Sequence, residues 1–377
     1  MSLAESTLAD LVAIDSASTR SNRPVIDYLQ ARLQRLGFRL HPRGYRDAAG
    51  AEKINLVACA GPHSEPPGRG GLALVGHTDT VPFDPAWTEA LVLQEREGRL
   101  FGRGACDTKG FIAAILAALE AVDLQALTRP LVAVFTADEE LGCLGAKRLL
   151  EERALQPALA IVGEPTGLRP VRAHKGFCHA EFEVRGHEGH SAYPHTGRSA
   201  IFDAARTLLA IEEVAAEITE EVHPDFEPPW TTLNVGLVEG GKALNVIPGS
   251  CRFSLEWRPI PGQPPERLTE LLDRQIARLK GEDPGFEASY RVVRRDPGVE
   301  VRPDAPLVRF LEQESGQPSG TVSFGTELPY FVALGAEGCV FGPGDIRVAH
   351  KTGEYVPRDQ LEQAVRILAR AITRFCC

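Results

Sequence analysis

The sequence predicts an α/β protein with a mainly parallel sheet covered by helices on both faces, plus an inserted ferredoxin-like α+β domain. Short apolar runs alternate with helical patterns in the first half of the chain, which is typical of βαβ units. Near residue 176 the strands begin to alternate polar and apolar residues, and after residue 295 the helix–strand alternation returns. A length of 377 residues suits two domains, which we place at 1–176 with 295–377, and at 177–294.

The first part of the chain begins with two predicted helices, Leu3–Ile14 and Pro24–Leu36, the second ended by Gly37. Strands and helices then alternate. The predicted strands are Asn55–Ala58, Leu72–Val75, Leu131–Thr136 and Ala158–Val162, and the predicted helices are Gly110–Val122 and Leu144–Arg153. The strands at 72–75 and 131–136 are apolar runs, as expected when helices cover both faces of a sheet.

The insertion is predicted to follow a β-α-β-β-α-β order, which is typical of a ferredoxin-like split unit. Its first strand, His179–Val184, alternates polar and apolar residues and therefore predicts a sheet with one wet face. The elements after it are a helix at Ser199–Ile218, strands at Thr231–Val238 and Cys251–Trp257, a helix at Pro265–Lys280 and a strand at Glu287–Val293. A final helix is predicted at Arg358–Phe375, after the insertion.

Composition excludes several classes of protein. A net charge of −10 argues against nucleic acid or an anionic membrane as the main partner. The N-terminus lacks the basic start and apolar run of a signal peptide, and no apolar stretch approaches the roughly 18 residues of a membrane span. Eight cysteines are scattered without a C-x-x-C pair, which favours reduced thiols in a cytoplasmic protein.

Five acidic or imidazole side chains stand where a predicted strand or turn ends: His77, Asp107, Glu140, Glu164 and His350. Because an α/β sheet presents ligands at the carboxyl ends of its strands, these side chains are expected to share one crevice. Imidazole nitrogen and carboxylate oxygen suit Zn²⁺, Co²⁺ or Mn²⁺. Two such ions about 3.5–4 Å apart would form a hydrolytic centre.

Glu139 and Glu140 are adjacent carboxylates at the mouth of an apolar strand, where they would repel each other unless a cation lies nearby. One would bind metal and the other would take a proton from water, and Asp138 beside them is expected to deepen the negative field. Asp79, two residues beyond His77, is expected to support that imidazole. Taken singly, His77 could lie in a polar turn, Asp107 could be a helix N-cap, and the glutamates could occupy a solvated loop.

The insertion offers three further polar candidates. His190 lies in a glycine-bounded turn, Asn245 lies at a strand break, and Arg258 ends a strand before a proline. An imidazole or amide can stabilise an oxyanion, and an arginine fork suits a substrate carboxylate. By residue type alone, a surface or capping role is favoured for each of them. Cys106 is an alternative nucleophile, but its small apolar neighbours and the lack of a dedicated base favour packing.

Six motifs, GHTDTVP, GRGACDTKG, ADEELGCLGA, VGEPTG, GHSAYPH and LNVIPG, follow one another along the chain. Over essentially its whole length the chain resembles the metal-dependent deacylase family of acetylornithine deacetylase, succinyl-diaminopimelate desuccinylase and the aminoacylase and glutamate carboxypeptidase relatives. The resemblance implies that Asp107 bridges two zinc or cobalt ions. It places His77 and Glu164 on one ion and Glu140 and His350 on the other.

The same resemblance implies roles outside the ligand set. Glu139 would be the general base, and Asp79 would stand behind His77. His190 would reach the site of a partner subunit in a homodimer formed by the insertion, which would also act as a lid. Arg258 and Asn245 would hold the substrate.

Within the family, VGEPTGLRPVRAHKG (162–176), GTELP (325–329) and GPGDIRVAHKTGEYVP (342–357) look most like the acetylornithine deacetylase branch. Cys106 and Thr108 depart from the Ala and Met frequent in the family, and Leu328 departs from Ala. The implied reaction is hydrolysis of an N-acetyl amino acid, foremost N-acetylornithine, to acetate and the free amino acid in arginine biosynthesis. Alternatives are deacetylation of acetylcitrulline, desuccinylation of succinyl-diaminopimelate, a metallo-dipeptidase, or an inactive binding protein of this fold.

Overall fold

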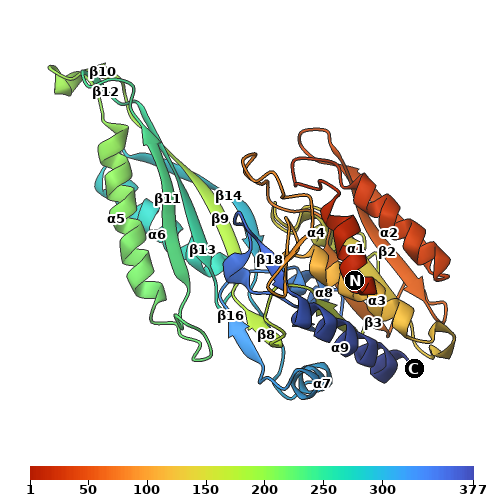
Figure 1. Ribbon diagram of the computed structural model, residues 1–377. Coiled ribbons are helices and arrows are strands. Elements are labelled where there is room, and N and C mark those ends of the chain that lie inside the picture. The colour runs from red at the N-terminus through yellow and green to blue at the C-terminus, as the bar shows by residue number, and fades with distance from the viewer. The chain divides into compact units, whose positions relative to one another are not determined.

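The computed structural model describes residues 1–377 and divides into two compact units (Figure 1). The first unit comprises Met1–Arg172, Val301–Gly320 and Thr326–Cys377, and the second comprises Ala173–Glu300 and Thr321–Gly325. The sequence placed the insertion at 177–294, whereas the second unit takes in a few more residues at each end. It also includes the short segment at 321–325, which no local sequence pattern marks.

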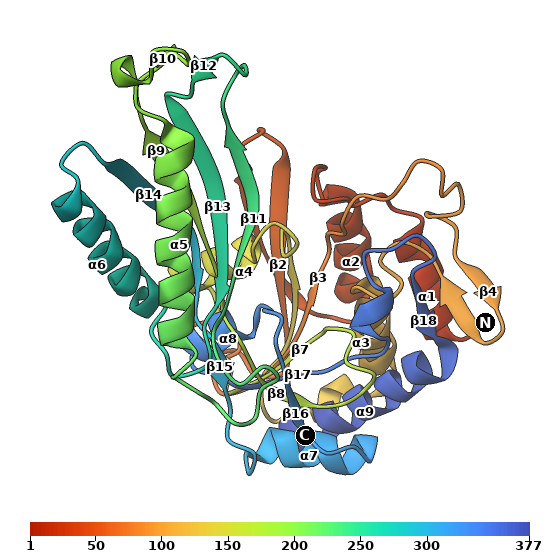
Figure 2. The ribbon, with the colours of Figure 1, turned by 90° about the vertical axis from the view of Figure 1, so that its left-hand side faces the viewer.

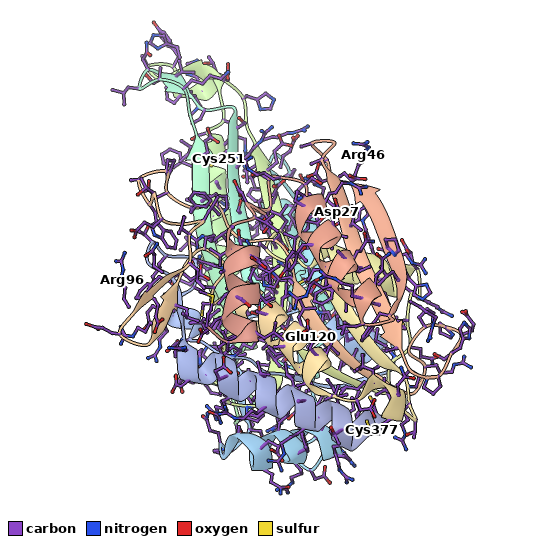
Figure 3. The ribbon with its side chains drawn as sticks, turned by 45° about the vertical axis from the view of Figure 1, so that its right-hand side comes forward. Asp27, Arg46, Arg96, Glu120, Cys251 and Cys377 are labelled. Carbon is purple, nitrogen blue, oxygen red and sulfur yellow. The ribbon has the colours of Figure 1, made fainter.

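The first unit is built on a mixed sheet with the strand order β1-β2-β6-β3-β7-β17. The strands are β1 (Arg39–Arg46), β2 (Glu52–Ala60), β6 (Leu131–Thr136), β3 (Leu72–His77), β7 (Leu159–Val162) and β17 (Glu337–Val340). The last four are mutually parallel, while β1 and β2 are antiparallel to their neighbours. The predicted, mainly parallel sheet is therefore confirmed. Strand β1 was not predicted, because its residues are mostly polar; Arg46 at its end is labelled in Figure 3.

Helices cover both faces of this sheet. They are α1 (Leu3–Val12), α2 (Arg23–Arg35), α3 (Lys109–Ala121), α4 (Leu144–Glu151), α7 (Pro306–Ser315), α8 (Leu328–Ala333) and α9 (Arg358–Cys376). Helix α3 packs against α1, α9 and β3, whereas α4 packs against α8 and β2. Leu72 and Leu74 of β3 join the core cluster of α1, α3 and α9, while Ala73 and Val75 are buried outside that cluster. The two apolar strands are thus covered on both sides, as predicted.

Smaller elements complete the first unit. Strands β4 (Gln94–Arg96), β5 (Arg99–Phe101) and β18 (Tyr355–Pro357) form a separate three-stranded sheet, and η1 (Leu124–Ala126) and η3 (Ile346–Val348) are short 3-10 helices. The large sheet has nine strands in all and continues past β17 through β8 (Val171–His174) and β15 (Val299–Glu300), with β16 (Gly320–Val322) paired to β8. These three strands lie where the chain passes from one unit to the other, and β15 belongs to the second unit. No helix is both long enough and apolar enough to cross a membrane.

The second unit confirms the predicted β-α-β-β-α-β order. It consists of β9 (Phe177–Arg185), α5 (Ala200–Ile218), β11 (Thr232–Gly240), β13 (Ser250–Arg258), α6 (Glu266–Glu282) and β14 (Glu287–Asp296), with a small ribbon of β10 (Gly189–His190) and β12 (Val246–Ile247) and the 3-10 helix η2 (Pro194–Thr196). The antiparallel sheet has the order β11-β13-β9-β14, and Figure 2 shows α5 lying along it.

Alternation of burial along the strands fixes which face of this sheet α5 and α6 cover. Cys178, Ala180 and Phe182 of β9 point into the core of the second unit together with Phe253 and Trp257 of β13. The residues between them are more exposed. The prediction of one wet face is therefore confirmed.

Candidate metal centre

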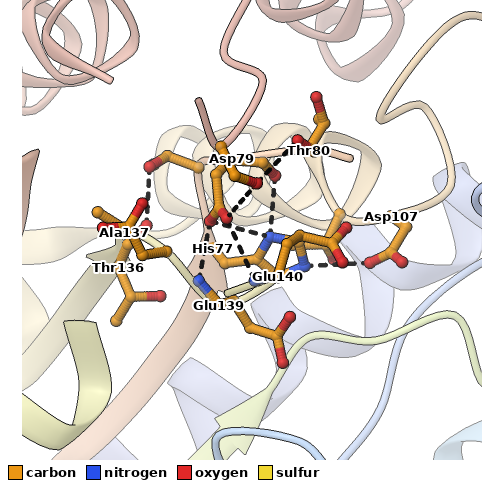
Figure 4. Close-up of polar contacts among 12 residues, drawn as sticks. His77, Asp79, Thr80, Asp107, Thr136, Ala137, Glu139 and Glu140 are labelled. Atoms are coloured by element: carbon orange, nitrogen blue, oxygen red, sulfur yellow. Dashed lines mark hydrogen bonds and ion pairs between the residues drawn. The ribbon is translucent and has the colours of Figure 1, made fainter. Parts of the chain in front are cut away.

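Three of the predicted ligands meet at one edge of the parallel sheet. One ligand atom from each of His77, Asp107 and Glu140 lies within 4.8 Å of the other two. His77 is the last residue of β3, and Glu140 follows the parallel neighbour β6, so the sheet itself brings them together. Asp107 arrives from the turn before α3, and its Oδ1 lies 3.0 Å from Nε2 of His77 (Figure 4).

His350 joins this cluster from the distant C-terminal segment. Its Nε2 lies 3.0 Å from Oδ2 of Asp107 and 3.1 Å from Oε1 of Glu140. Asp107 therefore presents one carboxylate oxygen to each of two imidazoles. Whether this carboxylate is shared between two cations, as the sequence predicts, stays a prediction. His350 adopts φ +61°, in the left-handed region that residues other than glycine rarely occupy.

Glu164 follows β7, the other parallel neighbour of β3. Its side chain is buried, and burial together with the negative charges of Asp107 and Glu139 raises its pKa well above the usual value. Glu164 is thus within the field of the cluster, although it does not belong to the tight group of three ligand atoms.

Asp79 holds the turn that carries the two glutamates. Its Oδ1 accepts the backbone N–H of Glu139 at 3.1 Å, and its Oδ2 accepts that of Glu140 at 3.2 Å (Figure 4). The nearest atom of Asp79 to Nδ1 of His77 is the backbone carbonyl oxygen, at 3.0 Å, while the carboxylate lies 3.6 Å away. Because a carbonyl oxygen only accepts, Nδ1 carries the proton and Nε2 faces the cluster, as metal binding requires.

The electrostatics of the cluster fit a bound cation. Burial, with repulsion from Glu140 and Asp107, raises the pKa of Glu139 to about 7. Against the cost of burial, hydrogen bonds to Asp107 and Asp79 raise the pKa of His77 well above its usual value. The charge of Asp107 contributes to the raised pKa of each of the three glutamates Glu139, Glu140 and Glu164. A divalent ion among them would relieve that repulsion, so the residues present fit such an ion.

A buried ion pair between Lys53 and Asp138 lies next to the turn that carries Glu139 and Glu140. Asp138 precedes Glu139 with φ +55°, and its carboxylate accepts from Lys53 Nζ at 2.6 Å and from the Tyr45 hydroxyl at 2.8 Å. We expected Asp138 to deepen the negative field, but Lys53 neutralises it. Sequence reasoning missed this partner, although a lysine inside the apolar run of β2 was a signal.

Replacing Lys53 with methionine is expected to lower the free energy of unfolding by about 3 kcal/mol, because it leaves the Asp138 carboxylate buried without its cation. Both Lys53 and Asp138 are almost completely inaccessible to solvent. Chemical denaturation would measure the change, with Lys147→Met on the exposed side of α4 as the matched control. A loss no larger than that of the control would contradict the assigned role of this pair.

Cys106 is a packed thiol. It is buried, its Sγ donates to the carbonyl of Asp345 at 3.5 Å, and burial together with the charges of Glu354 and Asp107 raises its pKa well above the usual value. A thiol held protonated in this way is a poor nucleophile. This environment supports the packing interpretation of Cys106.

The other predicted residues belong to the second unit. His190 lies in β10 and accepts the backbone N–H of Ala192 on Nδ1 at 3.1 Å, while the pairing of β10 with β12 places Asn245 beside it in the neighbouring loop. Arg258 ends β13, donates to Glu256 at 2.8 Å and lies over the ring of Phe177. Their roles toward the cluster remain predictions.

A parallel sheet that gathers carboxylates and imidazoles at its carboxyl edge defines a class of metal-dependent hydrolase. Residues 73–374 match the model of peptidase family M20/M25/M40, and the chain belongs to this family. It is a hydrolase of a metal-dependent family, as the motifs predicted.

Relatives and solved structures agree with this assignment. An acetylornithine deacetylase from Myxococcus xanthus is 57% identical over 372 residues, covering 98% of this chain and 97% of that protein. An acetylornithine deacetylase from Proteus mirabilis is 36% identical, covering 97% and 93%. The M20 family metallo-carboxypeptidase Sso-CP2 from Sulfolobus solfataricus has the same fold, with a TM-score of 0.77 at 19% identity over 98% of both chains.

Proposed function

We propose that this protein hydrolyses N-acetylornithine to acetate and ornithine, as a step of arginine biosynthesis. The observation that carries the proposal is the 57% identity to the Myxococcus xanthus acetylornithine deacetylase across nearly the full length of both chains. Cleavage of a linear amide is also chemistry to which a cluster of carboxylates and imidazoles is suited.

We propose that the cluster holds two divalent ions, zinc or cobalt, with Asp107 between them. His77 and Glu164 would complete one site, and Glu140 and His350 the other. The contacts that support this assignment are those of the two Asp107 oxygens, each 3.0 Å from a different imidazole. When bound, such ions polarise the scissile carbonyl and make water more acidic.

Glu139 would be the general base of the reaction. Its carboxylate would take a proton from water and pass it to the nitrogen of the departing amino acid. The backbone of Glu139 is fixed by Asp79, and its Oε1 accepts from the thiol of Cys143 at 3.3 Å, so the carboxylate is oriented while staying outside the contacts that join Asp107, Glu140 and His350. A base next to a ligand but distinct from it is what water activation requires.

We propose that the inserted domain, predicted at 177–294, supplies the remaining groups. Arg258 would bind the α-carboxylate of the substrate, since a guanidinium matches that group in charge and geometry. Asn245 would also hold the substrate, and His190 from a partner subunit would stabilise the oxyanion of the transition state. Asn245 adjoins His190 within one chain, so these two residues of a chain would enter the same site.

A homodimer through the inserted domain is proposed because α5 and the edge strand β11 share an apolar groove of about 560 Å³. Leu209, 61% exposed, and Leu233 are among its lining residues, and Leu237 on the same strand is 72% exposed. Leu209→Glu is expected to shift the mass in solution from about twice 40.9 kDa toward 40.9 kDa, because it places a charge in the contact. Light scattering would measure the mass, and a monomeric wild type would contradict the dimer.

We also propose a cytoplasmic location, supported by eight cysteines that form no disulfide. Its test is the redox state of these thiols in the protein isolated from cells.

A substrate panel tests the proposed reaction. The purified protein would be loaded with Zn²⁺ or Co²⁺ and offered N-acetylornithine, N-acetylcitrulline, succinyl-diaminopimelate and a dipeptide. We expect the highest kcat/KM for N-acetylornithine. A higher value for another substrate would reassign the specificity, and no turnover of any of them would favour a binding protein of this fold.

A further inference from the structure

Glu354 is a buried carboxylate that the proposed reaction does not use. It lies just before β18, four residues after His350 in the chain, and is 1% exposed. Its Oε1 accepts two backbone N–H groups, those of Cys106 and Asp107, each at 3.0 Å. Its own backbone carbonyl accepts the N–H of Gly102 at 3.0 Å. One residue therefore holds both ends of the turn that delivers Asp107.

Arg103 completes the arrangement. Its Nη1 donates to Oε2 of Glu354 at 2.6 Å, and the arginine is 2% exposed. Its guanidinium also lies over the ring of Trp87, and its backbone N–H donates to the carbonyl of Ala90 at 2.8 Å. Three donors face the two oxygens of the Glu354 carboxylate, while burial and the charge of Asp107 raise its pKa. Since Arg103 is itself anchored, it fixes Glu354 from the side opposite to the Asp107 turn.

We propose that Glu354, held by Arg103, is a positioning residue that fixes the Asp107 turn relative to the His350 segment. Asp107 and Glu354 are 247 positions apart in the chain, yet their contact joins the two segments that carry the proposed bridging ligand and a terminal ligand. The 3.0 Å approach of His350 Nε2 to Asp107 Oδ2 depends on both segments. This inference rests on the proposed two-ion site and assigns to Glu354 the spacing of the ion that Asp107 shares with His350.

The two proposed ions depend on Glu354 to different extents. His77 is carried by β3 and Glu164 follows β7, so the sheet positions two ligands of their ion, and only the Asp107 ligand of that ion is held by Glu354. His350 lies in a loop between η3 and β18, where Glu354 is the buried anchor. Removing the carboxylate should therefore weaken one ion much more than the other.

The test is a Co²⁺ titration of metal-free Glu354→Gln, followed by visible absorption and metal analysis, alongside the wild type. The variant keeps the size of the side chain, but it loses the charge and turns a donor toward either Arg103 or the backbone N–H groups. We expect one of the two binding steps to lose affinity about 10- to 100-fold while the other changes little. With N-acetylornithine, kcat should fall more than KM rises.

Glu312→Gln is the matched control, because Glu312 also accepts a backbone N–H, from Ser319 at 2.8 Å, and lies near an arginine in the same unit. Two unchanged Co²⁺ binding steps in Glu354→Gln, with only a loss of thermal stability like that of the control, would overturn the proposal. Should Glu354→Gln not fold, Arg103→Met decides. A loss of affinity in one of the two Co²⁺ binding steps of Arg103→Met supports the proposal, and unchanged binding of both ions overturns it.

The titration also separates this inference from the proposed function. If the wild type binds two Co²⁺ ions but does not cleave N-acetylornithine, the proposed reaction fails while the effect of Glu354 can still be measured. If the wild type is active and Glu354→Gln binds both ions normally, the positioning role alone fails.

Discussion

Glu139→Gln is expected to lower kcat on N-acetylornithine by about 10³-fold, because an amide cannot accept the proton that water must lose. The side chain keeps its size, and the backbone hydrogen bond to Asp79 does not involve the altered group. The metal content should therefore stay at the wild-type value. Steady-state kinetics and metal analysis on the same sample would measure both quantities.

The control for this variant is Glu151→Gln, the same chemical change on the exposed end of α4. It should leave kcat and metal content unchanged. If Glu139→Gln kept most of its turnover, the base would have to be another group. If it lost metal together with turnover, Glu139 would be a ligand.

Asp107→Asn is expected to have the second large effect on turnover. The cause would be weaker metal binding and not the loss of a proton acceptor. Both oxygens of Asp107 face an imidazole, and the substitution gives one of those imidazoles an amide that cannot be a charged ligand. The loss in metal affinity should exceed about 100-fold, since even the outer partners of metal ligands account for 10- to 100-fold. Turnover should fall with it at ordinary metal concentration.

Metal analysis after dialysis, and kcat measured against added Zn²⁺, would check this expectation. Asp123→Asn, at the N-cap of η1, is the matched control. Full metal content in Asp107→Asn would show that Asp107 is not shared between ions. These two variants thus separate the residue that moves a proton from the residue that holds the ions.

How much of this structure could be predicted depends on how local its determinants are. The apolar runs of β3 and β6 marked buried strands, and parallel neighbours place their following residues at one edge, so the approach of His77 to Glu140 was predictable. The β-α-β-β-α-β order of the second unit was likewise predictable, from the period of the apolar residues and the spacing of the segments. Strand β1 escaped prediction because an edge strand with alternating exposure carries no apolar run.

The supporting contacts could not be predicted, because their partners are distant in sequence. Lys53 meets Asp138 across 85 positions, and Glu354 meets the Asp107 turn across 247. A single charged residue does not reveal whether its partner is solvent or a buried ion. Asp138 illustrates this, since it looked like added negative charge and is instead paired with Lys53.

The number of ions needed for turnover tests the central claim most directly. Metal-free protein would receive Zn²⁺ or Co²⁺ in measured fractions of an equivalent, with the release of ornithine from N-acetylornithine recorded at each step. We predict no turnover without metal and a rise that is complete at two ions per chain. Turnover by the metal-free protein, or full turnover at one ion per chain, would contradict the assignment of a two-ion deacetylase centre built around Asp107.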